Sequence, residues 1–438
     1  MSFKEGLLRA RGQITFLVGL LLACGIAASL QTSSASFGPR AAKVRAWDSI
    51  PAAGTRALTS EERQAATIAW SYFRNNTQES GLVNSSDQYP STTMWDSGSA
   101  ILALVSAHRL GVIDRAELDD RLTSLLQALT RLPLFENALP NKSYNTISLT
   151  MADYTNKPSK DGIGWSALDI ARLMLALDVV IRHYPEHTAK ASQVSARFNF
   201  EPMLRDGVLY GARRKGGKTE RVQEGRLGYE QYAARAMMLG GHDASDAVNA
   251  TQWMRYASVE GIDVPVDTRT AASYGAFNYV VSEPYMLTGL ELGWDHASRH
   301  QAFGVYLAQE KRYEREGKLT AATEDHLDQA PYFAYNTVYA EGKEWNTITD
   351  TGADASRFRA MSVKAAFAWN ALYDTAYTKK LMAKAMTLRA EGRGFYSGLY
   401  EVTATPNRSL NCNTNAVVLE SLAYRTTGPL LALKKSTS

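Results

Sequence analysis

The sequence repeats one local pattern six times: a turn rich in glycine or aromatic residues, carrying acids or amides, runs directly into a helix of Ala, Leu and Gly. The pattern occupies residues 93–96, 164–169, 228–230, 282–285, the turn before 364–367, and 411–415. Degenerate repeats at intervals of roughly 50–80 residues are typical of stacked supersecondary units rather than of one irregular core. The recurring turn is therefore the first place to look for function.

Two kinds of predicted helix alternate along the chain. Inner helices, apolar or small on nearly every side, are expected at residues 99–110, 168–181, 232–239, 285–292, 363–372 and 416–424. More polar outer helices are expected at 58–73, 115–130, 187–198, 244–257, 298–316 and 378–391. Six such αα-hairpins can close into a ring. The sequence thus predicts an all-α fold, an (α/α)6 toroid of six helical hairpins, with short β-hairpins at 207–211 and 394–401 on the rim.

The N-terminal region predicts export. Basic residues precede an apolar run at residues 14–30, so residues 1–35 are expected to be a signal peptide or a membrane anchor. A cleaved signal, a lipoprotein signal at Cys24 and an uncleaved anchor all remain open, and all place the protein in the periplasm or cell envelope. Residues 36–58 are interpreted as a flexible lead-in and residues 59–430 as the toroid domain.

Composition narrows the class of partner. The formal net charge is only +4, which argues against nucleic acid. Aromatic residues make up 10% of the chain, and many of them lie in the turns, where they suit stacking on a flat polar ligand. A polysaccharide or oligosaccharide is therefore the expected partner, with a possible membrane tether through the N-terminus.

Four acids, Asp96, Asp169, Glu230 and Glu283, stand in the first turn of predicted inner helices. For any one of them, helix capping is the simpler explanation. As a group they would converge on one mouth of the ring, and they are flanked by aromatic residues: Trp95, Trp165, Tyr229 and Tyr285. A cleft that is both acidic and aromatic is suited to sugar chains.

Hydrolysis of a glycosidic bond needs one protonated and one ionised carboxyl group. Glu230 is the first choice as acid, because Tyr229 and an apolar run would partly desolvate it, and Asp96 is the choice as base or nucleophile. Asp169 is expected one helical turn below the ring of Trp165, although a buried salt bridge to Arg172 is an equal alternative. Further substrate contacts are expected from Tyr396, Asn413 and Asn415.

Metal and nucleophile motifs are weak. Pro185 separates His183 from His187, and the pair His296 and His300 has helical spacing without a third ligand nearby. No Gly-rich phosphate loop and no Ser nucleophile elbow is present in the sequence. The chain is expected to use neither a metal nor a cofactor.

The segment 279–287, followed by 289–295, resembles a bacterial family of unknown function described as glucoamylase-like, and residues 95–96, 332–340 and 394–401 support the match. The resemblance runs from about Ser60 to Tyr424. It implies an α/α toroid and an envelope role, and it carries over no catalytic residues.

The leading hypothesis is an exported glycoside hydrolase or transglycosylase acting on an envelope or secreted polysaccharide. Two alternatives of other classes are a non-catalytic glycan-binding or scaffold protein of polysaccharide export, and a toroid polysaccharide lyase.

Overall fold

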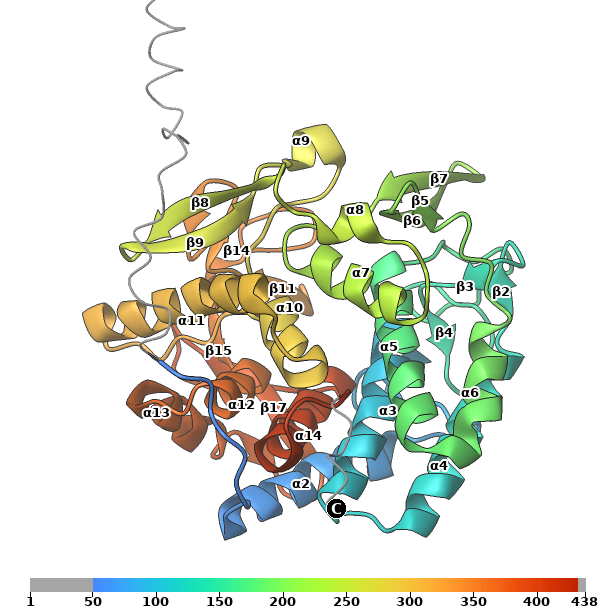
Figure 1. Ribbon diagram of the computed structural model, residues 1–438, viewed down its shortest axis with the longest axis horizontal. Helices are drawn as coiled ribbons and strands as arrows, with labels where there is room; N and C mark the ends of the chain where they lie inside the picture. Colours follow the sequence, from blue (N-terminus) through green and yellow to red (C-terminus); the bar gives the residue numbers. More distant parts are fainter. Residues whose placement is uncertain (1–49, 432–438) are drawn as a thin grey trace, which may run out of the picture. The chain divides into compact units, whose positions relative to one another are not determined.

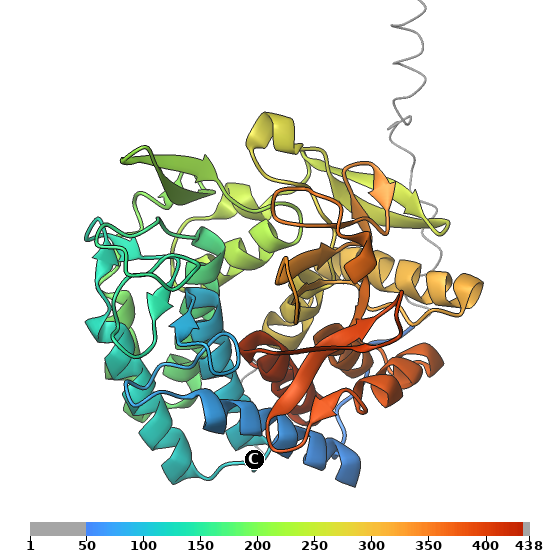
Figure 2. The ribbon, with the colours of Figure 1, turned by 180° about the vertical axis from the view of Figure 1, so that it is seen from behind.

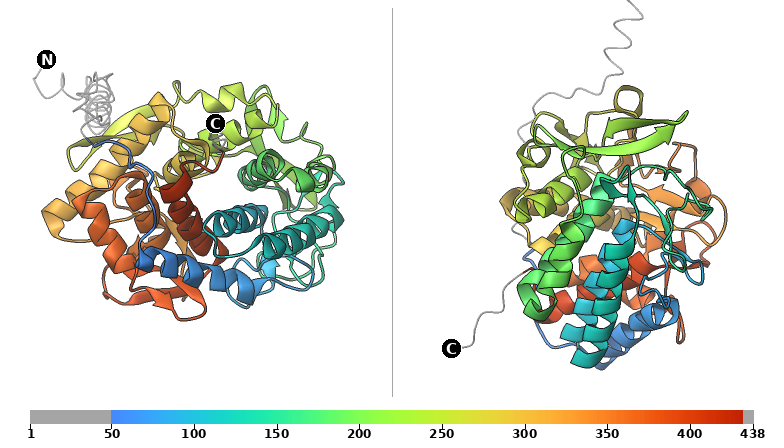
Figure 3. Two further views of the ribbon diagram at one scale, coloured as in Figure 1. Left: turned by 60° about the horizontal axis from the view of Figure 1, so that its bottom comes forward. Right: turned by 90° about the vertical axis from the view of Figure 1, so that its right-hand side faces the viewer.

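The computed structural model describes residues 50–431, and the expected export segment 1–35 lies outside them. Six inner helices contact one another in cyclic order, and the last contacts the first (Figures 1 and 3). They are α3 (Met94–Arg109), α5 (Ala167–His183), α7 (Tyr229–Leu239), α10 (Glu283–Leu287) with the π turn η3 (Thr288–Leu292), α12 (Val363–Leu372) and α14 (Cys412–Thr427). The predicted (α/α)6 ring is confirmed.

Outer helices cover this ring. α2 packs on α14, α4 on α3, α6 on α5, α8 on α7, α11 on α10, and α13 on α12. Their bounds, with the remaining short helices, are α2 (Ser60–Asn76), α4 (Arg115–Arg131), η2 (Pro185–His187), α6 (Thr188–Ser195), α8 (Ser245–Val248), α9 (Ala271–Tyr274), α11 (His296–Glu316), η4 (Ser356–Phe358) and α13 (Ala376–Ala385).

The all-α label is too narrow, because strands fill many of the connections. All pairings among the described strands are antiparallel, and most are hairpins between helices, whereas β1 pairs with β4 and β15 with β17 across two intervening helices. The strands are β1 (Ser91–Thr92), β2 (Leu134–Phe135), β3 (Leu139–Pro140), β4 (Tyr144–Asn145), β5 (Leu204–Arg205), β6 (Val208–Lys215), β7 (Lys218–Gln223), β8 (Met254–Val259), β9 (Ile262–Asp267), β10 (Glu324–His326), β11 (Phe333–Asn336), β12 (Tyr339–Ala340), β13 (Lys343–Glu344), β14 (Thr347–Ile348), β15 (Ala360–Ser362), β16 (Arg389–Ala390), β17 (Gly394–Tyr400) and β18 (Pro406–Leu410). The two predicted hairpin segments coincide with β6 and β17.

One predicted outer helix, residues 244–257, is wrong. Only the single turn α8 forms there, and the hairpin β8–β9 follows and packs against α11. Glu260 and Gly261 both have positive φ, 52° and 74°, which is the geometry of a two-residue type I′ turn. The buried, β-branched Val259, Val264 and Val266 favour strand over helix on either side of that turn.

Small residues let the inner helices approach closely. Almost every residue of α3 after Trp95 is buried. A Cβ added at Gly98 would lie 3.0 Å from the carbonyl oxygen of Arg172 on α5, so a larger side chain would push the two helices apart. Polar side chains begin the helices: Thr93 caps α3, Ser166 caps α5 and Asn411 caps α14. These caps fix the residue at which each of the three helices begins, and so the positions of the side chains in its first turn.

The described part of the expected lead-in, residues 50–58, is held against the toroid. The backbone N–H groups of Ala53 and Arg56 donate to the carbonyl oxygens of Leu372 and Arg425, near the C-terminal ends of α12 and α14, and Leu58 is buried. The chain thus enters the domain at the end of the ring opposite to the helix N-termini. Among the described helices, none is both long and apolar enough to cross a bilayer.

Candidate active site

The first turns of the inner helices meet at one end of the ring. Trp95 of α3 donates its indole N–H to Asn413 Oδ1 of α14 at 3.3 Å, and Asn413 Nδ2 donates to Glu283 Oε1 of α10 at 2.6 Å. Glu283 also forms an ion pair with Lys364 of α12. The ring of Tyr229 on α7 packs edge-on against Trp95, with centroids 5.7 Å apart. Turns separated by hundreds of residues therefore form one continuous mouth, as the repeat pattern predicts.

A cavity of about 770 Å³ opens beside this mouth. Two of its lining residues lie within electrostatic range of the mouth acids: His326 of Asp96 and Glu283, and Tyr154 of Asp169 and Glu224. The lining is formed by Ser86, Asp87, Tyr89, Tyr154, Thr155, His326, Leu327, Tyr332, Arg393, Tyr396, Arg408, Ser409 and Leu410. The lining segments come from the loops after α2 and before α5 and from the β10–β11 and β17–β18 regions, which face the viewer in Figure 2.

Asp169 and Glu224 form a carboxylate pair at the start of α5. Ser166 Oγ donates to Asp169 Oδ1 at 3.1 Å, and the backbone N–H of Ala167 donates to Glu224 Oε2 at 2.5 Å. Burial and then the charge of Glu224 raise the pKa of Asp169 to about 7. Burial also raises the pKa of Glu224. Part of the Asp169 surface stays accessible even though protein atoms surround it, so it is an acid poised near neutral pH in reach of a ligand.

Asp96 lies in a more polar environment. Both Ser85 Oγ and Thr93 Oγ1 donate to its Oδ2 atom, the latter at 2.8 Å, whereas no described residue donates to Oδ1. Hydroxyl donors stabilise a carboxylate anion. Asp96 interacts electrostatically with Asp169 on the neighbouring helix, which places two acids of different environment on one side of the mouth.

A buried charge cluster forms the opposite side. Lys364 Nζ pairs with Glu283 and lies 3.9 Å from Asp325 Oδ1. Neither oxygen of Asp325 has a hydrogen-bond partner among residues 50–431, and burial raises the pKa of Asp325 well above its usual range. Burial likewise raises the pKa of the neighbouring Glu324. One buried ammonium ion thus lies among three acids, and at Asp325 the effect of burial outweighs the opposing effect of that cation.

Glu230 does not have the environment expected of the acid. Its side chain is 5% exposed, Oε2 lies 2.6 Å from Arg269 Nη2, and Gln223 Nε2 donates to Oε1 at 2.9 Å. Burial raises the pKa of Glu230 while Arg269 opposes that shift. Each oxygen accepts from a protein donor, so this buried carboxylate joins α7 to the segment after β9.

Three residues expected to bind substrate are instead part of the walls. Trp165 is 1% exposed and donates its indole N–H to Tyr210 O at 2.9 Å. Because Trp165 precedes the Ser166 cap, it is not in α5, and the expected helical spacing to Asp169 does not apply. Tyr285 is 3% exposed. Asn415 is fully buried and uses its amide on the backbone of Phe395 and Asn411.

The remaining expected contacts lie at the site. Trp95 is half-buried at the mouth, and Tyr229 is buried against it. Tyr396 is partly exposed and lines the cavity. Asn413 is 8% exposed between Trp95 and Glu283.

Arg172 lies beneath the mouth and does not pair with Asp169. Its guanidinium donates to Glu291 Oε1 at 2.7 Å, to Glu420 Oε1 at 3.2 Å and to Tyr232 Oη at 2.8 Å, and all of these side chains are buried. It also stands 4.7 Å from the centroid of the Trp95 ring. This network fills the axis of the ring and holds Trp95 from below, so the salt bridge proposed for Asp169 is wrong.

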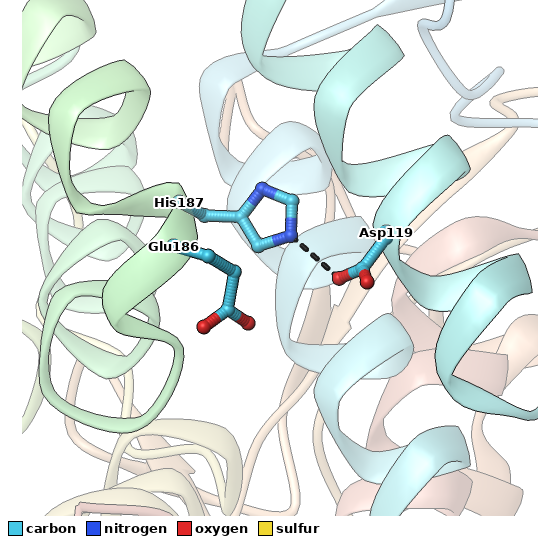
Figure 4. A group of neighbouring side chains, drawn as sticks. All are labelled: Asp119, Glu186 and His187. Atoms are coloured by element: carbon cyan, nitrogen blue, oxygen red, sulfur yellow. Dashed lines mark hydrogen bonds and ion pairs between the residues drawn. The ribbon is translucent and has the colours of Figure 1, made fainter.

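One group of possible metal ligands lies away from the mouth, on the outer elements α4 and η2. It consists of Asp119, Glu186 and His187, with His187 Nε2 2.7 Å from Asp119 Oδ1 (Figure 4). Arg115 forms ion pairs with both Asp119 and Glu186. A guanidinium therefore already neutralises these acids, and the cluster joins α4 to the end of α5.

Sequence reasoning missed Glu224, His326 and Asp325. Glu224 stands four residues before the Gly228–Tyr229 turn, and the cavity-lining His326 and its neighbour Asp325 belong to a strand outside the repeats. The one available signal for Glu224 is its place between a polar strand and Gly225, whose φ is 96° and which lies against Glu230.

Comparison with known proteins decides the family. A family model described as "Protein of unknown function (DUF3131)" matches residues 64–428. The chain belongs to this family. No curated protein matches it significantly.

The solved structures that resemble this member of the family share its fold at low identity. A candidate glucoamylase from Bacteroides caccae matches with a TM-score of 0.62 and 14% identity, over 85% of this chain and 94% of that one. An endo-β-1,2-glucanase from Chitinophaga pinensis, in complex with sophorotriose and glucose, matches with the same four values. The endo-β-1,2-glucanase from Talaromyces funiculosus, in complex with sophorose, has a TM-score of 0.56 and 10% identity over 84% of each chain. The expected glucoamylase-like resemblance is confirmed at the level of fold.

Proposed function

We propose that this protein is a glycoside hydrolase or transglycosylase that acts on a bacterial envelope or secreted polysaccharide after export. The observation that carries the proposal is a pair of acids in contrasting environments beside one cavity. Asp169 has a pKa near 7, whereas Asp96 is held by two hydroxyl donors. Enzymes that cleave glycosidic bonds need such a difference between two carboxyl groups.

In the proposed reaction, the Asp169 carboxyl donates its proton to the glycosidic oxygen as the bond from that oxygen to the anomeric carbon breaks. Asp96 acts on the anomeric carbon side, either by removing a proton from the attacking water or by attacking directly. Glu224 supports the acid role, because its charge makes Asp169 harder to ionise. We therefore assign the role of general acid to Asp169 instead of Glu230, because Arg269 and Gln223 bind the Glu230 carboxylate. No step in this scheme requires a metal or a cofactor.

The endo-β-1,2-glucanase structures that share the fold support a glucan as the first substrate to test. Their identity to this chain is too low to carry over the linkage. The envelope location rests on the predicted export segment, and the substrate class rests on the acidic and aromatic mouth.

The test incubates the protein with β-1,2-, β-1,3- and β-1,4-glucans, α-glucans and bacterial exopolysaccharides, and measures new reducing ends and oligomer lengths. Asp169→Asn and Asp96→Asn should each lower the rate by at least about 100-fold, the low end for general acid–base catalysis. Asp120→Asn, an exposed aspartate on outer helix α4, is the matched control. If Glu230→Gln abolishes activity while Asp169→Asn retains it, the acid assignment is wrong.

A glycan-binding protein without turnover is the second candidate, and exposed aromatic side chains in the cavity favour it as strongly as they favour an enzyme. Saturable binding of a polysaccharide without any new reducing ends would select it. An unsaturated, ultraviolet-absorbing product would select a lyase.

A further inference from the structure

Four tyrosines from separate segments line the cavity beside the mouth: Tyr89, Tyr154, Tyr332 and Tyr396. Three of them are among the most exposed large hydrophobic side chains of the described chain, at 42% for Tyr89, 69% for Tyr154 and 66% for Tyr332. An exposed aromatic ring on its own is unremarkable, but several around one cavity mark a binding surface. We call these four residues the tyrosine cleft.

Two of the tyrosines lie in or beside turns with left-handed backbone. Tyr332 has a φ of 67°, an uncommon conformation for a bulky residue, and Gln88 beside Tyr89 has a φ of 59°. The backbone N–H of Tyr332 donates to Gln329 O at 2.8 Å, and the N–H of Gln88 donates to Asn76 Oδ1 at 2.8 Å. The surrounding structure thus fixes the backbone from which these two exposed rings project, and left-handed non-glycine backbone of this kind clusters at ligand-binding sites.

The tyrosine cleft lies within electrostatic range of the acids. Tyr154 is close enough to Asp169 and Glu224 for their charges to act on its hydroxyl, and His326, on the same cavity wall, interacts with Asp96. The volume of about 770 Å³ is within the range of roughly 300–1,000 Å³ that holds a drug-sized ligand. That space exceeds the needs of one sugar ring.

We infer that the tyrosine cleft binds several consecutive sugar units of a polysaccharide chain, with rings of the chain stacked on Tyr154 and Tyr332 while one linkage lies at the carboxylates. Sugar rings present apolar C–H faces to aromatic rings and hydroxyl groups to the phenol oxygens. The ligand is therefore a chain rather than a mono- or disaccharide. This inference deepens the proposed function and shares its site, but stacking does not require cleavage.

The test measures binding in Asp169→Asn protein, so that turnover does not consume the ligand. Affinity electrophoresis in gels that contain each of the polysaccharides named above identifies those that retard the protein. Titration calorimetry then follows oligomers of two to eight units prepared from the polymer that retards it most. We expect the affinity to rise with length up to at least four units. Tyr154→Ala and Tyr332→Ala should each weaken binding of the longest oligomer about tenfold.

Ile147→Ala is the matched control, because Ile147 is 64% exposed on the same loop as Tyr154 and does not line the cavity. It should leave binding unchanged, and Tyr154→Phe and Tyr332→Phe should retain most of the affinity. Circular dichroism melting confirms that each variant is folded. The inference is overturned if no polysaccharide of the panel binds, if dimers bind as tightly as octamers, or if the alanine variants bind like the control.

The two proposals fail separately. If tyrosine-dependent binding is found but wild-type protein releases no reducing ends from the same polymer, the inference of chain binding in the tyrosine cleft is correct and the hydrolase proposal is wrong. If hydrolysis is found but the tyrosine variants keep wild-type KM and affinity, the hydrolase proposal is correct and the inference of chain binding in the tyrosine cleft is wrong.

Discussion

Replacing Asp169 by asparagine should stabilise the protein at neutral pH while removing its activity. The pKa of Asp169 is about 7 in the folded protein, because burial and Glu224 disfavour its charge. In the unfolded chain an aspartate titrates near 3.9. Ionised Asp169 therefore costs folding free energy, and Asp169→Asn removes that cost while keeping an oxygen for the Ser166 hydroxyl.

The sign and the pH window follow from proton linkage. Below about pH 4 both states are protonated and the cost is absent; between pH 4 and 7 only the unfolded state ionises, so stability falls as pH rises; above pH 7 the cost is constant. At 1.36 kcal/mol per pKa unit, the stability difference between variant and wild type should grow by at most about 2.6 kcal/mol from pH 5 to pH 8. Since part of Asp169 remains accessible to solvent, we expect about 1–2 kcal/mol.

Urea unfolding followed by circular dichroism at pH 5 and pH 8 measures this difference. Asp120→Asn is the control, because it makes the same chemical change on the exposed face of α4. Effects of titrating groups remote from Asp169 cancel between variant and wild type, and Glu224, the strongest charge neighbour, ionises more easily in the variant and adds in the same direction. An equal Asp169→Asn difference at the two pH values would refute the buried-acid argument.

Other measurements test the rest of the structure. Glu224→Gln should lower the pKa of Asp169, so the alkaline limb of the kcat/KM profile moves to lower pH than in wild type; an unmoved limb contradicts the coupling. Arg172→Met leaves two buried carboxyl groups without their cation and should lower the free energy of unfolding by about 3–5 kcal/mol, whereas Glu420→Gln should change it little, both measured in urea. A chain that begins at Thr59 should melt several degrees lower than one that begins at Ile50, because it loses a buried leucine and two backbone hydrogen bonds to the ring.

The sequence was sufficient for the ring but not for the full set of its outer helices. The inner helix 363–372 was predicted with the bounds of α12, because a run of small and apolar residues between Ser362 and Tyr373 admits no other element. The predicted outer helix 244–257 is wrong, because the type I′ turn at Glu260 and Gly261 pairs residues 254–259 with 262–267 as a hairpin. The backbone geometry of this turn therefore determines the local structure more strongly than the composition of residues 244–257 does.

At the site, too, the sequence predicts some features and not others. Convergence of Asp96, Asp169 and Glu283 followed from the repeat, because equivalent turns of a closed ring must face one mouth. The environment of each acid did not follow, because it depends on distant partners. Glu230 meets Arg269, thirty-nine residues away, and Asp169 meets Glu224, whose carboxylate binds a backbone N–H fifty-seven residues earlier.

Asp169 and Asp295 show why the local sequence cannot identify a catalytic acid. Each stands at a helix N-terminus and accepts a hydrogen bond from a serine hydroxyl, Asp169 from Ser166 and Asp295 from Ser298. Burial disfavours the charge of both. At Asp295 the backbone N–H and hydroxyl of Ser298, with Arg235, outweigh burial and lower the pKa.

At Asp169 no guanidinium is adjacent among the described residues. Burial and then the charge of a second carboxylate, Glu224, raise the pKa of Asp169 to about 7. The field of a helix N-terminus should lower that pKa. Asp169 therefore holds its proton to higher pH than its own helix favours, because burial and then the charge of Glu224 disfavour the carboxylate. That combination costs folding free energy, and proton donation at neutral pH is a function that would account for its presence in the mouth of this ring.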